Sequence, residues 1–245
     1  MAKEIKETIK FELETSESLA NAIRRSVNEI PTLAVDEVEF FKNDSALHDE
    51  MIAHRIGLIP LKNEKLKLSE KCSCKGEGCA KCERRSKLVK KGPATVYSQD
   101  MSGYDVVYEG IPITILDKNQ ELEAEAIARM GIGINHVKWS PGVLFYKNVK
   151  ELKTGSNAKT VSEIFASCPN KCGLGEKIEN NKTYEMDICD ACEEALERNE
   201  IKLSDVEKLV FHVESFGQID AEDIFPEAVE VLKENLEIVS KELKK

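Results

Sequence analysis

Three observations predict an α+β protein. Apolar and polar residues alternate with a period of two at 6–15 and again at 206–219, as they do in half-buried strands. Apolar residues instead recur every three or four positions at 17–30 and 225–243, as they do along one face of a helix. Between these segments, short apolar stretches broken by Gly and Pro predict several more strands.

The composition indicates a folded chain large enough for more than one domain. Its 245 residues are 41% hydrophobic, and no stretch approaches the roughly 18 apolar residues that a membrane span needs. The first residues, "MAKEIKETIKFELET", contain no hydrophobic signal-peptide core. The net charge of −10 opposes a large contact with nucleic acid, which relies on clustered Lys and Arg. We therefore expect a cytoplasmic protein whose main partners are other proteins.

The first predicted helix follows the strand "KETIKFELET". Ser16 is suited to cap its N-terminus, and Pro31 stops it. Arg24 and Arg25 lie off its apolar stripe. That stripe consists of Leu19, Ile23, Val27 and Ile30.

The middle of the chain is predicted to alternate strands with two short helices. "TLAVDEVEFFKN", "KWSPGVLFYKNVKEL" and three short runs within 94–116 predict strands. A short helix is predicted at 46–61, with Met51, Ile52 and Ile56 facing inward. "NQELEAEAIARMG" is predicted to be a helix from its composition, ending at Gly131.

The last segment carries a heptad-like stripe, which we call the C-terminal seam. Its spacings of four and three predict a helix of about five turns. A helix of this kind can pack on its own domain, but so narrow a stripe favours contact with another chain. The seam consists of Phe225, Val229, Leu232, Leu236, Val239 and Leu243.

Eight cysteines fall into two sets of four, which in a cytoplasmic protein indicates metal or redox chemistry. The first set, in "KCSCKGEGCAKC", has spacing C-x-C-x4-C-x2-C, and Gly76 and Gly78 free the backbone to curl around an ion. Four thiolates suit Zn²⁺, and they also suit an iron-sulfur cluster. This first tetrad consists of Cys72, Cys74, Cys79 and Cys82.

The second tetrad lies in a polar insertion and has two interpretations. As C-x3-C and C-x2-C pairs it is a zinc site. As a degenerate ferredoxin site, it would use Cys189 and Cys192 as the first two ligands and Cys168 as the remote one. Ala195 stands where that motif needs a third cysteine, so a cluster would use Cys172 instead or be a three-iron form. The tetrad consists of Cys168, Cys172, Cys189 and Cys192.

No catalytic constellation is visible in the sequence. His48 and His54 are six residues apart, whereas a zinc protease needs a spacing of four. "GIGIN" lacks a phosphate-loop lysine, and His136 is expected to be a surface or hydrogen-bonded histidine. We therefore expect no catalytic residues in this chain, even if it belongs to an enzyme complex.

Several motifs together carry a resemblance to a known family. The long stretch "LANAIRRSVNEIPTLAVDEVEFFKNDSALHDEMIAHRIGLIPL", then "GPATVYSQD" and "GINHVKWSP", occur in that order. They closely resemble the D subunit of archaeal DNA-directed RNA polymerase, a member of the family of alpha and alpha-like assembly subunits. The resemblance covers essentially the whole chain.

The resemblance implies an alpha-subunit-like fold in three parts. Both chain ends, 1–38 and 203–245, would form a dimerisation domain. Residues 39–162 would form an inserted, mainly β domain with a metal-binding loop at 72–82. Residues 163–202 would form a small ferredoxin-like insert that holds the second tetrad.

The resemblance also implies partners and interface residues. The chain would pair with the small L subunit, and this heterodimer would be the platform for the large catalytic subunits and other small subunits, with little contact to nucleic acid. Arg24, Arg25, His54 and Arg55 would support the junction with the second-largest subunit. Core and interface with the L subunit would be formed by Leu19, Ile23, Val27, Val229, Leu232, Leu236 and Val239.

For the metals, the resemblance favours Zn²⁺ in the first tetrad, because the equivalent loop of eukaryotic relatives holds zinc. Many archaeal relatives hold iron-sulfur clusters in the insert, which favours [4Fe-4S] or [3Fe-4S] in the second tetrad. The departure at Ala195 leaves Zn²⁺ open there.

Two other functions compete with an assembly subunit. The second tetrad suits an iron-sulfur electron-transfer or redox-sensing protein. A zinc-ribbon nucleic-acid binder would use the basic run "CERRSKLVKK", but the acidic net charge disfavours it and favours a solvated face there.

Overall fold

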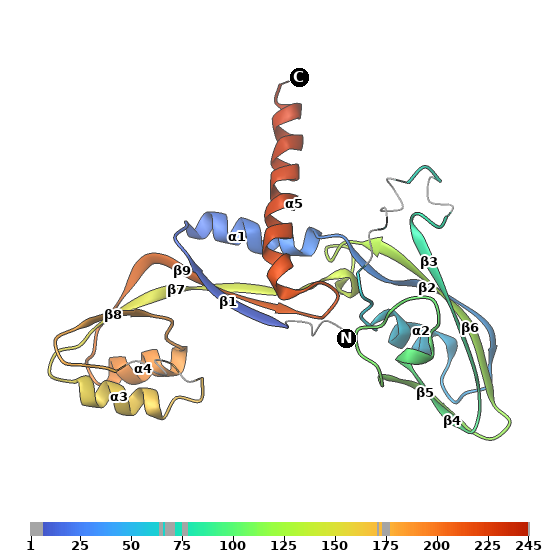
Figure 1. Ribbon diagram of the computed structural model, residues 1–245, viewed down its shortest axis with the longest axis horizontal. Helices are drawn as coiled ribbons and strands as arrows, with labels where there is room; N and C mark the ends of the chain where they lie inside the picture. The colour runs from blue at the N-terminus through green and yellow to red at the C-terminus, as the bar shows by residue number, and fades with distance from the viewer. Residues whose placement is uncertain are drawn as a thin grey trace. The chain divides into compact units, whose positions relative to one another are not determined.

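The computed structural model shows a mixed α/β chain that is rich in sheet (Figure 1). It describes residues 7–63, 66, 72–74, 78–170, 172 and 177–244. The chain divides into two compact units. The first consists of Met1–Ile9, Ile23–Val143 and Val213–Lys245. The second consists of Lys10–Ala22 and Leu144–His212.

The first unit is built around a three-stranded antiparallel sheet in the order β2-β6-β3. These strands are β2 (Thr32–Asn43), β3 (Glu83–Lys91) and β6 (Glu121–Gly131). A hairpin-like pair, β4 (Ala94–Tyr97) and β5 (Pro112–Leu116), and helix α2 (Asp49–Gly57) pack with it around one apolar core. Its largest fully buried side chains include Leu33, Ile52, Ile56, Leu88, Leu116 and Leu122.

The predicted helix at 119–131 is wrong, because this segment forms strand β6. Glu, Ala, Leu and Met favour helices in isolation, and that composition led to the prediction. The residues nevertheless alternate, so that Leu122, Ala126 and Ala128 are buried in one core. Pairing with β2 on one side and β3 on the other outweighs the intrinsic preference.

A second sheet has four strands in the order β1-β9-β7-β8. Strands β1 (Thr8–Leu13) and β9 (Leu203–Ser215), from opposite parts of the sequence, are neighbours in it, as Figure 1 shows. Strand β7 (Gly142–Lys153) pairs antiparallel with β8 (Thr183–Met186). Within the sheet, Phe11 of β1 stacks on Phe211 of β9 with ring centroids 5.4 Å apart. The strands predicted at both ends of the chain therefore share one sheet.

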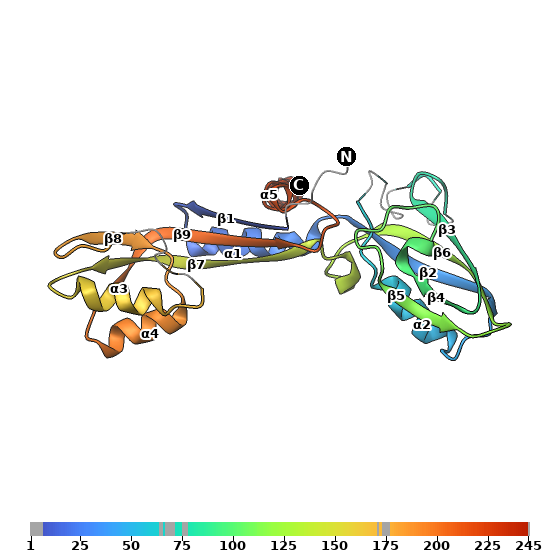
Figure 2. The same cartoon turned by 60° about the horizontal axis from the view of Figure 1, so that its bottom comes forward.

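The polar insertion folds around the second tetrad. Helices α3 (Ala158–Ala166) and α4 (Asp190–Arg198), neither of which was predicted, pack beside each other and against β7 and β8 (Figure 2). Their shared core includes Val161, Phe165, Leu196 and the cysteines of the second tetrad.

Three further helices match the predictions in position, with two corrections. Helix α1 (Glu17–Ser26) continues as a 3-10 turn at Val27–Glu29, and Ser16 Oγ accepts a hydrogen bond from Leu19 N–H (3.3 Å). Leu19 is exposed and does not join the buried stripe, and Met51 of α2 is exposed too, although it was predicted to face inward. Helix α5 (Ala221–Glu242) carries the C-terminal seam.

Of the three runs within 94–116 that were predicted as strands, "YDVVYEG" (104–110) forms no strand, although Val106 makes an isolated bridge with Leu61. Two further 3-10 turns lie at Ser98–Asp100 and Val137–Trp139. None of the helices in the described residues is long and apolar enough to cross a membrane. The three-part domain division implied by the resemblance remains a prediction.

Candidate metal centres and interaction surfaces

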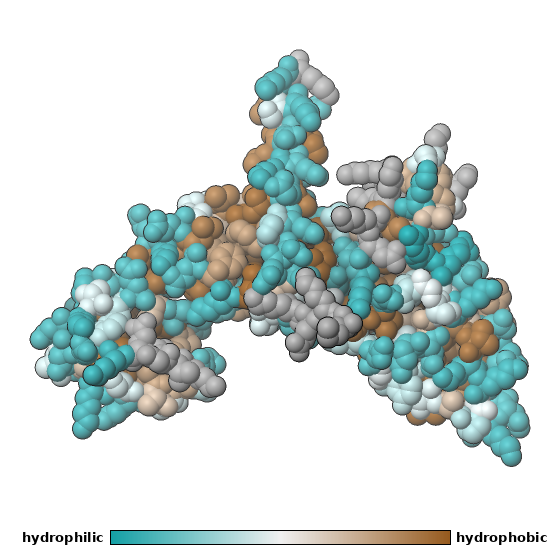
Figure 3. All heavy atoms as spheres, in the orientation of Figure 1, coloured by the Kyte–Doolittle hydropathy of each residue, from teal (hydrophilic) through white to brown (hydrophobic). Residues whose placement is uncertain are grey.

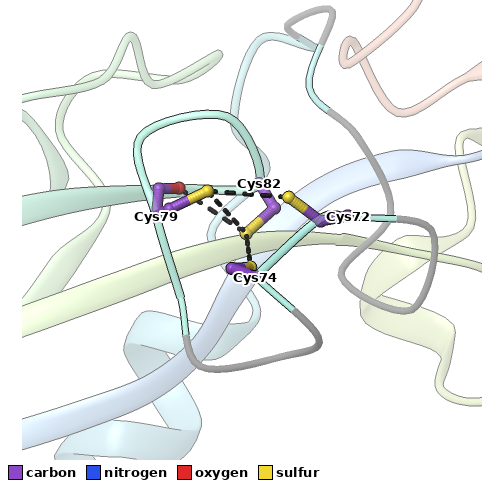
Figure 4. A group of neighbouring side chains, drawn as sticks. All are labelled: Cys72, Cys74, Cys79 and Cys82. Atoms are coloured by element: carbon purple, nitrogen blue, oxygen red, sulfur yellow. Dashed lines mark hydrogen bonds between the residues drawn. The ribbon is translucent and has the colours of Figure 1, made fainter.

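The first tetrad lies at the end of a loop that leads directly into β3. Its four sulfurs all lie within 4.8 Å of one another, and three separations are 3.5, 3.6 and 3.7 Å (Figure 4). Four thiolates around one Zn²⁺ with Zn–S bonds of about 2.3 Å would be about 3.8 Å apart. These three of the six separations are therefore close to those around a single tetrahedral ion.

A tight turn presents the last two ligands of this tetrad. The N–H groups of Cys82 and Glu83 both donate to the carbonyl of Cys79, at 2.9 and 3.0 Å. This brings the sulfurs of Cys79 and Cys82 to the same side of the turn, as Figure 4 shows. Gly78 precedes the turn with φ +87, a left-handed conformation that glycine adopts without strain.

The thiols of the first tetrad have different pKa values when no metal is bound. A hydrogen bond from the backbone of Cys74 lowers the pKa of Cys72 to about 6. Burial raises the pKa of Cys82 to about 12. Four thiolates this close repel one another, so a bound cation is what allows all four to lose their protons. The donor set therefore fits a divalent metal with a preference for sulfur.

The second tetrad is formed by two cysteines that follow the C-terminal end of α3 and two at the N-terminal end of α4. Cys189 is the N-cap of α4 and Cys192 lies in its first turn, so that a C-x2-C pair faces the two cysteines that follow α3. All four sulfurs lie within 4.8 Å of one another, and Cys168 Sγ is 3.6 Å from Cys189 Sγ. Both tetrads predicted from spacing are thus brought together and could bind a metal.

The pKa values of the thiols in the second tetrad also differ from one another. A hydrogen bond from the backbone of Cys172 lowers the pKa of Cys168 to about 6. Burial raises the pKa of Cys172 to about 11, although its sulfur accepts a hydrogen bond from Cys189 N–H at 3.2 Å. Burial also raises the pKa of Cys192.

Lysines of β7 hold the segment that carries the second tetrad. Lys147 pairs with Asp190 at 3.2 Å and Lys150 with Glu193 at 2.8 Å, which ties the first turn of α4 to the sheet. Asp187, two residues before Cys189, pairs with Lys10 of β1 at 2.8 Å. The metal site and the four-stranded sheet are therefore held together by ion pairs.

Helix α5 exposes much of the C-terminal seam. The helix is anchored as far as Asn235, because Ile224 and Ala228 are buried and Asn235 donates to Glu29 at 2.7 Å. Beyond that, Leu236 is 61% exposed, Val239 55% and Leu243 82%. Figure 3 shows hydrophobic side chains along this helix. The described chain does not bury the far half of the seam.

The other predicted interface residues divide by burial. Ile23 and Val27 are buried and belong to the chain's own core, whereas Val229 and Leu232 are half-buried. Leu19 is exposed. The predicted junction residues Arg24, Arg25, His54 and Arg55 are all exposed.

His54 and His136 line a common pocket of about 220 Å³ between α2, β2 and the 3-10 turn at Val137–Trp139. The pocket has an apolar part that includes Val35 and Leu58. His136 Nδ1 accepts a hydrogen bond from Lys138 N–H at 3.1 Å, which fits the hydrogen-bonded histidine predicted there.

The basic run after the first tetrad is largely paired within the protein. Arg85 pairs with Glu83 and Glu125, at 3.1 and 3.0 Å, and Lys91 pairs with Glu121 at 3.2 Å. These carboxylates reduce the charge that the run would offer to a phosphate backbone. Two of the acidic partners, Glu121 and Glu125, lie far along the chain on β6, so their pairing with the run was not visible in the sequence.

A family model for the "RNA polymerase Rpb3/RpoA insert domain" matches residues 27–145. This match and the mixed α/β fold define the class of protein, an alpha-like chain with an Rpb3/RpoA insert.

Curated relatives of this chain, which match it over most of its length, are RNA polymerase subunits by name. "DNA-directed RNA polymerase subunit Rpo3" of Archaeoglobus fulgidus is 33% identical over 95% of this chain and 92% of its own length. Rpo3 of Methanosarcina acetivorans is 38% identical over 89% and 87%. "DNA-directed RNA polymerases II, IV and V subunit 3" of Arabidopsis thaliana is 33% identical over 94% and 86%. The chain belongs to the Rpo3/Rpb3 family of RNA polymerase subunits, which confirms the family resemblance found in the sequence.

Proposed function

We propose that this chain is a non-catalytic assembly subunit of an archaeal DNA-directed RNA polymerase, in the position of the D subunit. It pairs with a small alpha-like subunit, the L subunit, and the heterodimer is the platform for the large catalytic subunits. Family membership favours this role over the electron-transfer alternative, since the relatives bear the names of polymerase subunits.

The exposed half of the C-terminal seam is the observation that carries the proposal. Leu236, Val239 and Leu243 recur at spacings of three and four, so they lie on one side of α5. An exposed row of this kind, in a chain with a net charge of −10, marks a surface that another protein covers. A second helix with its own apolar stripe is the partner that fits a heptad seam.

Co-expression tests the pairing. The chain and the small alpha-like subunit, with a tag on the small subunit only, are expected to co-purify in a 1:1 ratio. Replacing Leu236 and Val239 with Asp places two charges in the seam and is expected to abolish co-purification. Glu234→Lys, on a different side of the helix, is the matched control and is expected to leave it intact. Equal recovery of the unaltered chain, the double Asp variant and the Glu234→Lys variant with the small subunit would contradict the proposal.

The proposal includes the domain division that the resemblance implies. We assign 1–38 with 203–245 to dimerisation, 39–162 to the inserted domain and 163–202 to the ferredoxin-like insert. The exposed residues Arg24, Arg25, His54 and Arg55 would face the second-largest subunit, as the resemblance implies. Charge reversal at Arg25 is expected to weaken binding of the large subunit without weakening the pair with the small subunit.

Each tetrad is assigned one structural Zn²⁺. The closest sulfur separations, 3.5–3.7 Å, match a single tetrahedral ion. In a [4Fe-4S] cluster each cysteine bonds a different iron, which spreads the sulfurs, whereas all four sulfurs of the second tetrad lie within 4.8 Å of one another. When bound, the ions supply folding energy to their loops.

Anaerobic purification tests the metals. Elemental analysis is expected to give two Zn per chain and no iron or sulfide, with no visible absorption band. Cys192→Ser is expected to reduce the zinc content to one. Iron and sulfide in stoichiometric amounts would overturn the assignment of zinc to the second tetrad.

A further inference from the structure

Glu83, which directly follows the ligand Cys82, is a buried carboxylate. It is only 7% exposed, although it starts strand β3 beside a polar loop. Arg85 Nε lies 3.1 Å from Glu83 Oε1, and a nitrogen of Arg129 lies 3.4 Å from Oε2. Removing a carboxylate from water is costly unless it is paired, and two guanidinium groups provide the pairing here.

The same carboxyl group lies against the metal loop. A Cβ atom added at Gly78 would be 2.7 Å from Glu83 Cδ and would also collide with the carboxylate oxygens. The loop therefore passes directly over the carboxyl group, and only glycine, with φ +87, allows that approach. Next to it, Arg84 donates a hydrogen bond of 2.6 Å to the carbonyl of Ala80. The residues that follow the last ligand thus hold the loop at two points.

Arg129 links this carboxylate to the body of the sheet. It lies on β6, and it pairs with Glu37 of β2 at 2.8 Å and with Asp36 at 3.3 Å. Its carbonyl accepts a hydrogen bond from Trp139 Nε1 at 3.1 Å. The metal loop, Glu83 and two neighbouring strands are therefore joined by one network of contacts.

We propose that Glu83 is a positioning residue of the first metal centre. Its carboxylate supports the backbone at Gly78, and Arg129 and Arg85 fix the carboxylate, so that the four sulfurs are held in place before the ion binds. This rests on the metal proposed for the first tetrad. The basic run "CERRSKLVKK" thereby gains a structural function beside the metal.

The charge of Glu83 and its positioning role have opposite effects on the rate of metal release, so an experiment can distinguish them. Binding of Zn²⁺ to the four cysteines, with loss of their remaining thiol protons, makes the site more negative, and a nearby carboxylate opposes that change. If only its charge mattered, neutralising Glu83 would slow metal release. If it positions the loop, neutralising it speeds metal release, because a loosened outer support commonly costs 10–100-fold in metal affinity.

The experiment compares zinc release from the full chain with Glu83→Gln and Glu123→Gln. Glu123 is an exposed carboxylate on β6 and serves as the matched control. Zinc transfer to a chromophoric chelator is followed at a temperature well below unfolding. The Glu83→Gln chain is expected to release zinc from the first tetrad about 10–100 times faster than the unaltered chain does. The Glu123→Gln chain is expected to release it at the same rate as the unaltered chain.

Folding of the Glu83→Gln chain is secured by the remaining partners. Arg85 keeps Glu125 at 3.0 Å and Arg129 keeps Glu37, so circular dichroism is expected to be unchanged. An unchanged or slower release from Glu83→Gln would overturn the positioning role. An unaltered chain that carries no zinc in the first tetrad would instead overturn the proposed metal itself.

A double-mutant cycle with Gly78 gives a second readout. Gly78→Ala is expected to speed zinc release strongly, because its methyl group meets the carboxylate. In the Glu83→Ala background the same change is expected to have a smaller effect, since the colliding group is gone. Additive effects of the two substitutions would contradict contact between these residues.

Discussion

Truncating two seam residues of α5 is expected to weaken the heterodimer strongly while leaving the free chain as stable as before. Leu236 is 61% exposed and Val239 55%, so most of each side chain is available to a partner. Full burial of such a side chain contributes about 1.5–3 kcal/mol, so covering these exposed portions contributes about 1–2 kcal/mol each. Their loss in Leu236→Ala with Val239→Ala, about 2–4 kcal/mol together, is then expected to raise Kd roughly 30- to 900-fold.

Isothermal titration with the purified small alpha-like subunit measures this change. Glu234→Ala is the control and is expected to alter Kd less than twofold. Urea unfolding of the free double variant is expected to stay within about 0.5 kcal/mol of the unaltered chain, because the replaced groups are exposed. A threefold or smaller change in Kd, or a large loss of stability in the free chain, would refute a partner surface and favour packing within the chain.

Three further outcomes are expected. Chelation of the first metal should increase hydrogen exchange at 78–82 before the sheet β2-β6-β3 opens, and simultaneous exchange throughout would contradict a local structural metal. Gly131→Ala should destabilise the chain by about 1–3 kcal/mol, because the added methyl lies 2.9 Å from Cζ2 of Trp139; a neutral effect in thermal unfolding would refute this packing. Burial alone would raise the pKa of Asp100, but the hydrogen bond from Lys90 lowers it below its usual value. The Lys90–Asp100 pair therefore adds to the free energy of unfolding above the unfolded pKa of about 3.9, and this contribution is lost as the pH falls through the lower folded pKa. Asp100→Asn should therefore be less stable at pH 7, by about 0.5–1 kcal/mol, and the gap should close in acid; a gap independent of pH would contradict the ion pair.

Local sequence patterns predicted those strands and helices in which apolar residues recur with a regular period. The strands that contain Phe11 and Phe211 and the helix that carries the seam were found, because apolar residues alternate with polar ones in the strands and recur every three or four positions along the helix. The spacing of the cysteines predicted both tetrads, since ligands that are close in sequence need only a turn to converge.

The failures arose where distant contacts decide the structure. Strand β6 is made of helix-favouring residues, and its state is set by pairing on both sides with β2 and β3. Met51 matched a helical stripe but lies beyond the edge of the buried face. Glu83 and Arg129, 46 residues apart, gave no signal, because no local pattern reports an ion pair between strands.

Native mass spectrometry of three purified proteins tests the central claim most directly. The chain is mixed with the small alpha-like subunit and with the second-largest catalytic subunit of the same polymerase. The account predicts a 1:1:1 complex that carries two zinc ions and forms only when the chain and the small subunit are both present. A large subunit that binds the small subunit without the chain, or a chain that enters no complex, would contradict it.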